Sequence, residues 1–173
     1  MNSLDIVDIY NENKEKVGYT KVRYKDTLEL GEYIIGVQAI IINSKKEILI
    51  SKRSENKKAY PSMWECNGGA ITTGETSIQG ILREIKEELG IDFREEDAIL
   101  IKTIKKENQF KDLYLFVKDI NVEDIRFQDN EATEVKWVNI DKFIRMYQNN
   151  EIVPNVDFGT EDYEICLNII QKI

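Results

Sequence analysis

The first third of the chain alternates between apolar and polar stretches in a way that predicts β-strands. Residues 4–10 carry apolar side chains at positions 4, 6, 7 and 9, and residues 17–24 show a similar pattern. The polar residues 11–14 between them are typical of a turn, so the two strands are expected to form a hairpin. Residues 33–42 are rich in isoleucine and valine, which is typical of a strand buried on both faces, and residues 47–52 predict a strand that pairs with it.

The rest of the chain predicts a mixture of helices and strands. Residues 53–74 contain Pro61 and three glycines and are expected to form one long loop, a feature that is usually functional in a compact domain. Residues 76–89 have the apolar spacing of a helix, with Thr76 as the expected N-cap residue. Further strands are expected over residues 99–106, 111–118 and 135–138, and further helices over residues 141–148 and 160–172. This order indicates an α/β fold in which a mixed sheet is flanked by helices on both faces.

The composition fits one domain with a short extension and narrows the range of functions. The 173 residues include 24 basic and 32 acidic side chains, and the net charge of −8 argues against a general nucleic-acid-binding protein. No apolar stretch approaches the roughly 20 residues needed to cross a bilayer, and acidic residues stand where a signal peptide would be basic. With only two cysteines and no CxxC pair, a soluble cytoplasmic protein with reduced thiols and no membrane partner is expected.

The chain contains no histidine, which excludes several kinds of catalytic site. A serine–histidine–acid triad and a cysteine–histidine pair are both ruled out. Metal sites that depend on imidazole ligands are ruled out as well. Acid–base or metal chemistry must therefore be carried mainly by carboxylates, lysine, tyrosine, cysteine or backbone groups.

The predicted helix over residues 76–89 has an acidic face separate from its apolar face. An arc of about 100° holds the apolar stripe, which consists of Ile78, Ile81, Leu82, Ile85 and Leu89. Glu84, Glu87 and Glu88 share another arc, and Gly80 lies among them one turn earlier, where it would let an ion or a substrate approach closely. Carboxylates about 5–6 Å apart repel by roughly 3 kcal/mol at an effective dielectric constant near 20, and a hard divalent cation such as Mg²⁺ or Mn²⁺ would relieve this repulsion. The alternative is a solvated face on which basic residues of the same helix pair with the glutamates.

Residues 69–91 contain a spaced pattern that resembles the signature of the Nudix hydrolases. The segment reads GAITTGETSIQGILREIKEELGI and matches that signature without one departure. The constrained positions are Gly69, Glu75, Arg83, Glu84, Ile85, Glu87, Glu88, Gly90 and Ile91. The signature falls on a predicted loop and helix, as the family requires, and the resemblance extends over residues 33–150.

This resemblance implies a Nudix-type α/β/α sandwich for residues 33–173, preceded by a β-hairpin appendage over residues 1–32. It implies an enzyme that cleaves a diphosphate linkage in a small molecule, a nucleoside diphosphate joined to a group X. Water would attack phosphorus with the help of Mg²⁺ or Mn²⁺. By motif position, the metal ligands would be Glu84, Glu87, Glu88 and the carbonyl group of Gly69. Glu75 and Arg83 would form a supporting ion pair that holds the loop against the helix.

The resemblance leaves the general base and the phosphate-binding groups open. Family members use either a signature glutamate or a glutamate from another loop, so Glu87, Glu131 and Glu134 are candidates. Glu131 is favoured over Glu134 because it lies further from the predicted strand and is freer to turn inward. Lys52 and Arg53 end a predicted strand beside the long loop and could hold phosphate oxygens.

Two other functions remain open on the sequence. The N-terminal half is also similar to isopentenyl-diphosphate isomerases, which are Nudix relatives with a catalytic cysteine and a metal site that contains histidines. Aligned from Gly74, that cysteine falls on Gly68, so Cys66 is displaced by two positions and its histidine neighbours do not exist. The other alternative is a non-catalytic module that senses a nucleotide or binds a partner, although such modules usually lose the carboxylates that are kept here. The hairpin could cover the pocket or form the contact of a homodimer.

Overall fold

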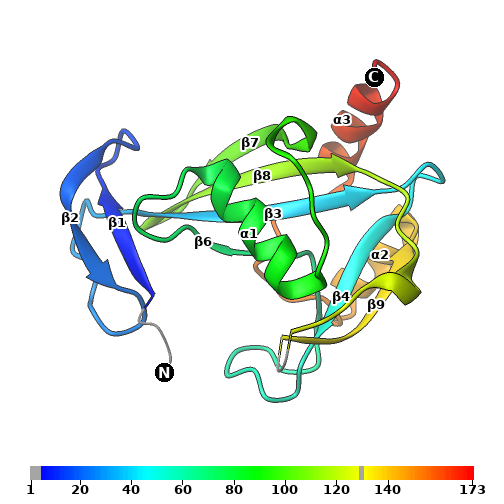
Figure 1. Ribbon diagram of the computed structural model, residues 1–173, viewed down its shortest axis with the longest axis horizontal. Helices are drawn as coiled ribbons and strands as arrows, with labels where there is room; N and C mark the ends of the chain where they lie inside the picture. The colour runs from blue at the N-terminus through cyan, green and yellow to red at the C-terminus, as the bar shows by residue number, and fades with distance from the viewer. Residues whose placement is uncertain (1–4, 129–130) are drawn as a thin grey trace.

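The computed structural model describes residues 5–128 and 131–173, and a mixed β-sheet lies at its centre. Within these residues the sheet consists of β3 (Ile34–Ile42), β4 (Ile48–Arg53), β5 (Trp64–Glu65), β6 (Gly68–Ala70), β7 (Ile99–Lys105), β8 (Gln109–Val117) and β9 (Ala132–Val138). A separate two-stranded sheet is formed by β1 (Ile6–Tyr10) and β2 (Lys16–Val22), and it lies at one end of the molecule (Figure 1).

β3 and β8 are neighbours in the middle of the main sheet. They pair in parallel over their whole length, from Ile34 opposite Gln109 to Ile42 opposite Val117. The other pairs of this sheet are antiparallel, and β4 and β6 both pair with β3 on the side away from β8. The strand order is therefore β5-β4-β3-β8-β7, with β6 added to β3 and β9 added to β4. The predicted mixed sheet is confirmed.

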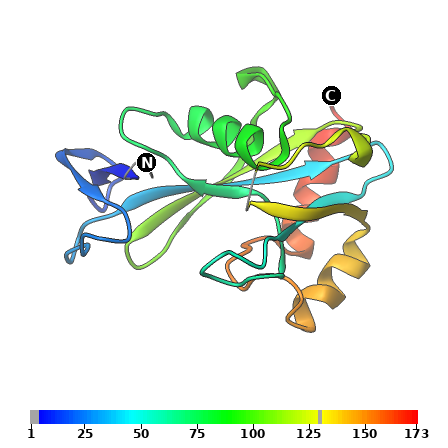
Figure 2. The same ribbon diagram turned by 60° about the horizontal axis from the view of Figure 1, so that its bottom comes forward.

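Helices cover both faces of this sheet, as the sequence pattern predicts (Figure 2). They are α1 (Ser77–Leu89), α2 (Ile140–Gln148), α3 (Thr160–Ile170) and the short 3-10 helices η1 (Glu95–Asp97) and η2 (Val122–Asp124). α1 packs on the face to which Val37, Ala39 and Ile41 of β3 point. α2 and α3 pack on the opposite face, with Ile40 and Ile42. Consecutive residues of β3 thus belong to two cores, which explains why nearly the whole strand is apolar.

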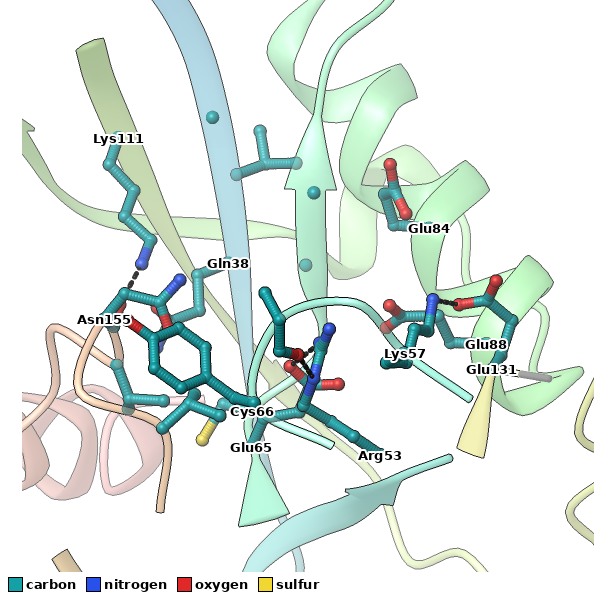
Figure 3. A pocket seen from close by; sticks show the side chains of 18 of the residues that line it. Gln38, Arg53, Lys57, Glu65, Cys66, Glu84, Glu88, Lys111, Glu131 and Asn155 are labelled. Carbon is teal, nitrogen blue, oxygen red and sulfur yellow. Dashed lines mark hydrogen bonds and ion pairs between the residues drawn. The ribbon is translucent and has the colours of Figure 1, made fainter. Parts of the chain in front are cut away.

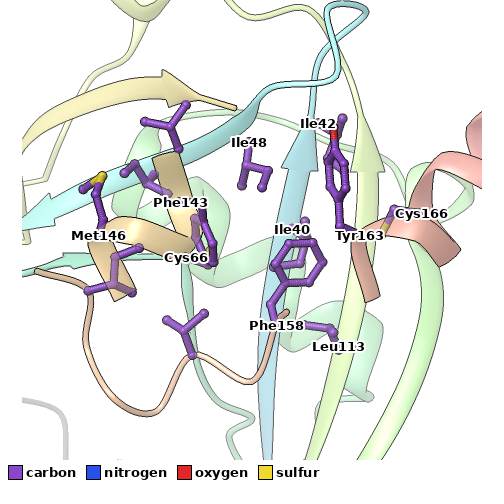
Figure 4. Packing of buried hydrophobic residues seen from close by; sticks show 14 of the residues in the cluster. Ile40, Ile42, Ile48, Cys66, Leu113, Phe143, Met146, Phe158, Tyr163 and Cys166 are labelled. Carbon is purple, nitrogen blue, oxygen red and sulfur yellow. The ribbon is translucent and has the colours of Figure 1, made fainter. Parts of the chain in front are cut away.

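The core on the side of α2 and α3 is closed by aromatic side chains (Figure 4). Phe143 and Phe158 meet edge to face, with their ring centroids 5.8 Å apart. Cys66 and Cys166 are buried in the same core as free thiols. Because burial disfavours the thiolate, it raises the pKa of both thiols to about 12, and neither is a ready nucleophile at neutral pH.

Several predicted boundaries differ from the structure. Residues 53–74 are not one continuous loop, because β5 and β6 form within them. Each of these strands is too short to show a periodic pattern in the sequence. β9 begins at Ala132 rather than at residue 135, and its first residues, which include the exposed Thr133 and Glu134, are held by pairing with β4. Leu4, the start of the first predicted strand, lies outside the described residues.

The N-terminal hairpin is attached to the loop that precedes α1. The backbone N–H of Thr73 donates to the carbonyl of Ile6 at 2.9 Å, and the N–H of Gly74 donates to the Asp8 carboxylate at 3.1 Å. Lys14, at the tip of the hairpin, donates to the buried Asp112 carboxylate of β8 at 2.6 Å. Within the part of the chain that the structure describes, no helix has both the length and the apolar character to span a membrane.

Candidate active site

α1 begins and ends with strong capping interactions that fix its position. The Thr76 hydroxyl accepts a hydrogen bond from the backbone N–H of Gln79, whose side chain accepts one from the N–H of Thr76. At the other end, Gly90 adopts a left-handed conformation with φ of 69°, which glycine tolerates without strain. The helix therefore presents its side chains from a rigid frame.

Gly80 does not lie open to the acidic cluster, contrary to the expectation from the helical wheel. It is buried against the loop before α1, and a methyl group at this position would overlap the side chain of Ile71. The physical reason is the close packing of the helix on that loop, which leaves no room for a Cβ atom. The absence of a side chain at Gly80 thus serves helix packing rather than access of an ion.

Arg83 joins α1 to the loop that precedes it. Its guanidinium donates to both oxygens of Glu75, at 2.7 and 3.0 Å, and to the carbonyl of Ala70 at 3.1 Å. Glu75 in turn accepts from the backbone N–H of Thr72 at 2.8 Å. The structure therefore brings Glu75 and Arg83 together in a forked ion pair, and this pair ties the loop to the helix.

Glu84, Glu87 and Glu88 lie in the second half of α1, and Figure 3 shows Glu84 and Glu88 at the same side of the pocket. The Glu84 carboxylate lies directly against the backbone of Gly69, where a Cβ atom would overlap it. Arg83 donates to Glu84 at 3.0 Å and to Glu87 at 3.1 Å, so its guanidinium stands between two of the three carboxylates. Glu88 is buried, whereas the side chain of Glu84 is 15% exposed and that of Glu87 is 44% exposed.

Burial changes the titration of these acids. It raises the pKa of Glu84, with Arg83 acting in the opposite direction. Burial raises the pKa of Glu88 well above its usual range, and the negative charges of Glu65 and Glu84 raise it further. The Asn67 amide opposes this shift because it donates to the Glu88 carboxylate at 2.8 Å. The site thus concentrates more negative charge than its protein partners neutralise.

This donor set fits a hard divalent cation. Carboxylate and carbonyl oxygens are the ligands that Mg²⁺ and Mn²⁺ prefer, and the glycine at position 69 leaves the backbone open beside Glu84. Among the described residues, no three acidic or cysteine side chains already converge on one point as a metal site would require. In this structure the Arg83 guanidinium forms ion pairs with both Glu84 and Glu87.

A cavity of about 470 Å³ extends from the acidic cluster of α1 to side chains of β3 and β8. On the α1 side it is lined by Glu84, Glu87, Glu88, Glu131 and Lys57. On the other side it is lined by Gln38, Lys106, Gln109, Lys111 and Asn155. Figure 3 shows Gln38, Lys111 and Asn155 together at one side of the pocket and Glu84, Glu88 and Glu131 at the other. The volume suits a small-molecule ligand.

The candidate bases fall in different places. Glu131 lines the cavity and forms an ion pair with Lys57. Glu134 does not line the cavity. It lies opposite Lys52 in the pairing of β4 with β9, and its carboxylate forms an ion pair of 2.8 Å with the Lys52 amine. The Glu134 side chain is 56% exposed. Arg53 does line the cavity, but its guanidinium already donates to Glu65 at 2.7 Å. The structure therefore places Glu131 and Arg53 at the cavity and places Lys52 and Glu134 outside its lining.

The sequence analysis does not predict the cavity residues that come from β3 and β8. Gln38 gives a detectable signal, because it is a polar residue inside the otherwise apolar run of residues 33–42. Gln109 and Lys111 give none, because an exposed strand end would carry the same residue types. Arg23 also lines the cavity and comes from the hairpin, so only the tertiary contact reveals it.

Comparison with known proteins assigns the chain to a family. Residues 32–155 match the family model described as the NUDIX domain. A Nudix hydrolase of Listeria innocua is 32% identical over 148 residues, which cover 85% of this chain and 87% of that protein. A crystal structure of a protein from Deinococcus radiodurans has a TM-score of 0.71 at 21% identity, and the match covers 94% of this chain and 98% of that one. A bifunctional NMN adenylyltransferase/ADP ribose pyrophosphatase of Francisella tularensis, solved with AMP and a manganese ion, has a TM-score of 0.56 at 22% identity, covering 81% of this chain and 42% of that one. The chain therefore belongs to the Nudix hydrolase family.

Proposed function

We propose that the protein is a metal-dependent diphosphohydrolase that cleaves a diphosphate linkage in a nucleoside diphosphate joined to a group X. The observation that carries this proposal is the contact between the largely covered Glu84 carboxylate and the backbone of Gly69. Glu84 lies close to a second acid, the buried Glu88, and burial raises the pKa of both, so a bound divalent cation would stabilise their ionised forms.

The residues present would hold a divalent cation, Mg²⁺ or Mn²⁺, through Glu84, Glu87, Glu88 and the Gly69 carbonyl. When bound, such an ion neutralises diphosphate charge and acidifies water, which is why no histidine is needed. Arg83 would have to release Glu84 or Glu87 on binding. The two hydrogen bonds from Arg83 to Glu75 would hold the guanidinium in place during this change.

The other groups of the cavity act on the substrate and on water. Glu131 is the proposed general base, since its carboxylate lines the cavity on the α1 side and can accept a proton from an attacking water. Lys57 forms an ion pair with Glu131 at the wall of the cavity. Arg53 is the proposed phosphate-binding group from β4. Glu87 is the alternative base, because it is the most exposed of the three helix carboxylates.

A non-catalytic role is less consistent with the site, because the whole set of signature carboxylates is retained. Isomerase activity is also disfavoured. The Cys66 thiol lines the cavity but is buried with its pKa raised to about 12, so it is a poor acid–base group. A cytoplasmic location and a homodimeric state stay predictions, as does the division into residues 1–32 and 33–173.

A screen of diphosphate compounds tests the proposal. The purified chain is incubated with nucleoside triphosphates, nucleoside-diphosphate sugars and dinucleotides, each with Mg²⁺, with Mn²⁺ and with EDTA. Phosphate release is read with and without an added phosphatase, which separates attack on an internal diphosphate from release of terminal phosphate. We expect cation-dependent cleavage of an internal linkage. Absence of hydrolysis across the panel with both cations would refute the enzyme assignment.

A further inference from the structure

Gln38 carries a buried polar group that has no partner within the protein. In the described part of the chain, its Nε2 atom is the buried side-chain polar atom without a hydrogen bond. The residue is 2% exposed and lines the cavity. Since an unpaired buried N–H group is costly, its retention at the centre of an apolar strand points to a partner that is supplied from outside.

Gln109 places a second amide in the same part of the cavity. It lies opposite Ile34 at the start of β8, and its Nε2 atom occupies the space where a Cβ atom of Gly36 would lie. Gly36 and Gln38 both stand on the β3 face that looks away from α1. The glycine at position 36 therefore makes room for the Gln109 amide beside Gln38.

Two lysines add positive charge to these amides. Lys111 and Lys106 both line the cavity and share one carboxylate, Asp157, at 3.0 and 2.6 Å. Two cations against one anion leave a surplus of positive charge. Burial lowers the pKa of Lys111, and Asp157 only partly opposes this effect, so a further anion nearby would stabilise the charged amine.

We infer that Gln38, Gln109, Lys106 and Lys111 form a binding site for an oxyanion, a phosphomonoester or a carboxylate, carried by the substrate away from the diphosphate that is cleaved. The inference rests on the proposed function, because it names the chemical class of group X. Every group named here offers N–H donors, and an oxyanion supplies the acceptor oxygens that Gln38 lacks. The acidic cluster lies on the other side of the pocket, so the substrate spans it with its diphosphate at α1 and its second anion at β3 and β8.

Matched pairs of compounds test this inference. Coenzyme A and its 3′-dephospho form differ by one phosphomonoester, as do NADP⁺ and NAD⁺. UDP-glucuronate and UDP-glucose differ by one carboxylate. Dissociation constants are measured by calorimetry in EDTA, where repulsion between the diphosphate and α1 is nearly the same for both members and cancels in their ratio. We expect the charged member of at least one pair to bind about tenfold more tightly, as one added charge-assisted hydrogen bond would give.

Variants separate the site from the rest of the cavity. Gln38→Leu removes an amide that makes no bond through Nε2, so the fold should be retained while the preference falls to about twofold or less. Lys111→Met should have the same effect on the preference. Gln148→Leu and Lys45→Met are matched controls on the exposed surface and should leave the preference unchanged. Equal binding of both members in every pair, or a preference that survives both Gln38→Leu and Lys111→Met, would overturn the inference.

The same compounds distinguish this inference from the proposed function when they are turned over with Mg²⁺. A charge preference in binding without any hydrolysis would support the oxyanion site and refute the diphosphohydrolase. Hydrolysis that follows the nucleobase and ignores the second anion would support the diphosphohydrolase and refute the oxyanion site. The ratio of kcat/KM within each pair is therefore compared with the ratio of dissociation constants measured in EDTA.

Discussion

Asn67 donates a hydrogen bond of 2.8 Å from its Nδ2 atom to the carboxylate of Glu88, and both residues are buried. The same amide donates to the Ser51 hydroxyl at 3.1 Å. Asn67 thus stabilises the ionised form of an acid whose pKa burial raises well above its usual range. The position just before Gly68 and Gly69 therefore influences the charge of the α1 cluster.

Glu88→Gln is expected to separate stability from activity. Because the folded protein holds the pKa of Glu88 above its unfolded value, the folded state binds more protons between these two values. The free energy of unfolding of the metal-free protein should then decrease as pH rises through that window. In EDTA at pH 7, Glu88→Gln should raise Tm by about 2–4 °C for each kcal/mol gained, and this gain should vanish toward acidic pH.

The same variant should lower hydrolysis by orders of magnitude, and Glu87→Gln should do so as well. Added Mg²⁺ should raise the Tm of the wild type and raise that of Glu88→Gln much less. Scanning fluorimetry across pH, with and without Mg²⁺, measures these effects. Undiminished hydrolysis in the double variant would remove both residues from the metal site.

Asn67→Leu should show the opposite pattern of stability. It removes a donor to Glu88, so the loss should be largest where Glu88 is ionised and smaller at acidic pH. We expect a cost of about 1–3 kcal/mol near neutral pH, because a charged acceptor is left buried and unpaired. Urea unfolding in EDTA at two pH values measures it. Ser51→Ala, which removes the weaker partner of Asn67, should cost less and show no pH dependence, and a pH-independent loss in Asn67→Leu would contradict the account.

Arg83→Leu should destabilise the cation-free protein. The substitution removes the paired hydrogen bonds to Glu75 and leaves Glu84 and Glu87 without their counter-charge. We expect the free energy of unfolding to decrease by about 2–4 kcal/mol. Mg²⁺ should restore part of this loss, since it neutralises the same carboxylates. Lys86→Met is the matched control, because its ion pair with Asp92 is exposed and should contribute little. A loss that Mg²⁺ leaves unchanged would mean that Arg83 only braces the loop.

Glu131→Gln and Glu134→Gln should differ sharply in rate. Glu131 lines the cavity, so its loss as a base should lower kcat by roughly 10²-fold or more without weakening Mg²⁺ binding. Glu134 lies outside the lining and pairs with Lys52, so its substitution should leave kcat nearly unchanged. Steady-state kinetics with a Mg²⁺ titration measures both. Equal kcat values in the two variants would contradict Glu131 as the general base and favour Glu87 instead.

Lys14→Ala should loosen the N-terminal hairpin. Among the described residues, it leaves the buried Asp112 carboxylate with the hydroxyl groups of Ser77 and Thr103 as its side-chain partners. The expected results are a loss of about 1–3 kcal/mol and faster proteolytic cleavage within the hairpin. Lys16→Ala is the control, since its bond to Asp8 stays inside the hairpin. Cleavage at the same rate in both variants would show that the tip contact does not hold the appendage in place.

The sequence predicts the fold and the acidic helix well because both depend on local patterns. Residues 33–42 have the apolar run of a buried strand, and the helix over residues 76–89 has a cap, an apolar stripe and a terminal glycine, all of which lie close together in the chain. β5 and β6 leave no such pattern, because two or three residues cannot display a period.

The cavity could be predicted only in part, because its lining comes from distant segments. The spacing of the helix glutamates indicates the acidic side. Gln38 and Lys111 come together through the parallel pairing of β3 with β8, which no short-range pattern encodes. The helical wheel predicts the wrong role for Gly80 for a similar reason, since its neighbour Ile71 reaches it only after the loop folds back on α1.

The bond between Lys14 and Asp112 joins residues 98 positions apart, and this separation bears on the order in which the chain acquires its structure. During synthesis the hairpin leaves the ribosome long before β8 exists, and for that interval its tip has no acid to bind. Contacts of such long range form slowly, because the entropy of closing a large loop must be overcome first. The hairpin, although it is made before β8, should therefore be among the last elements to reach its final place.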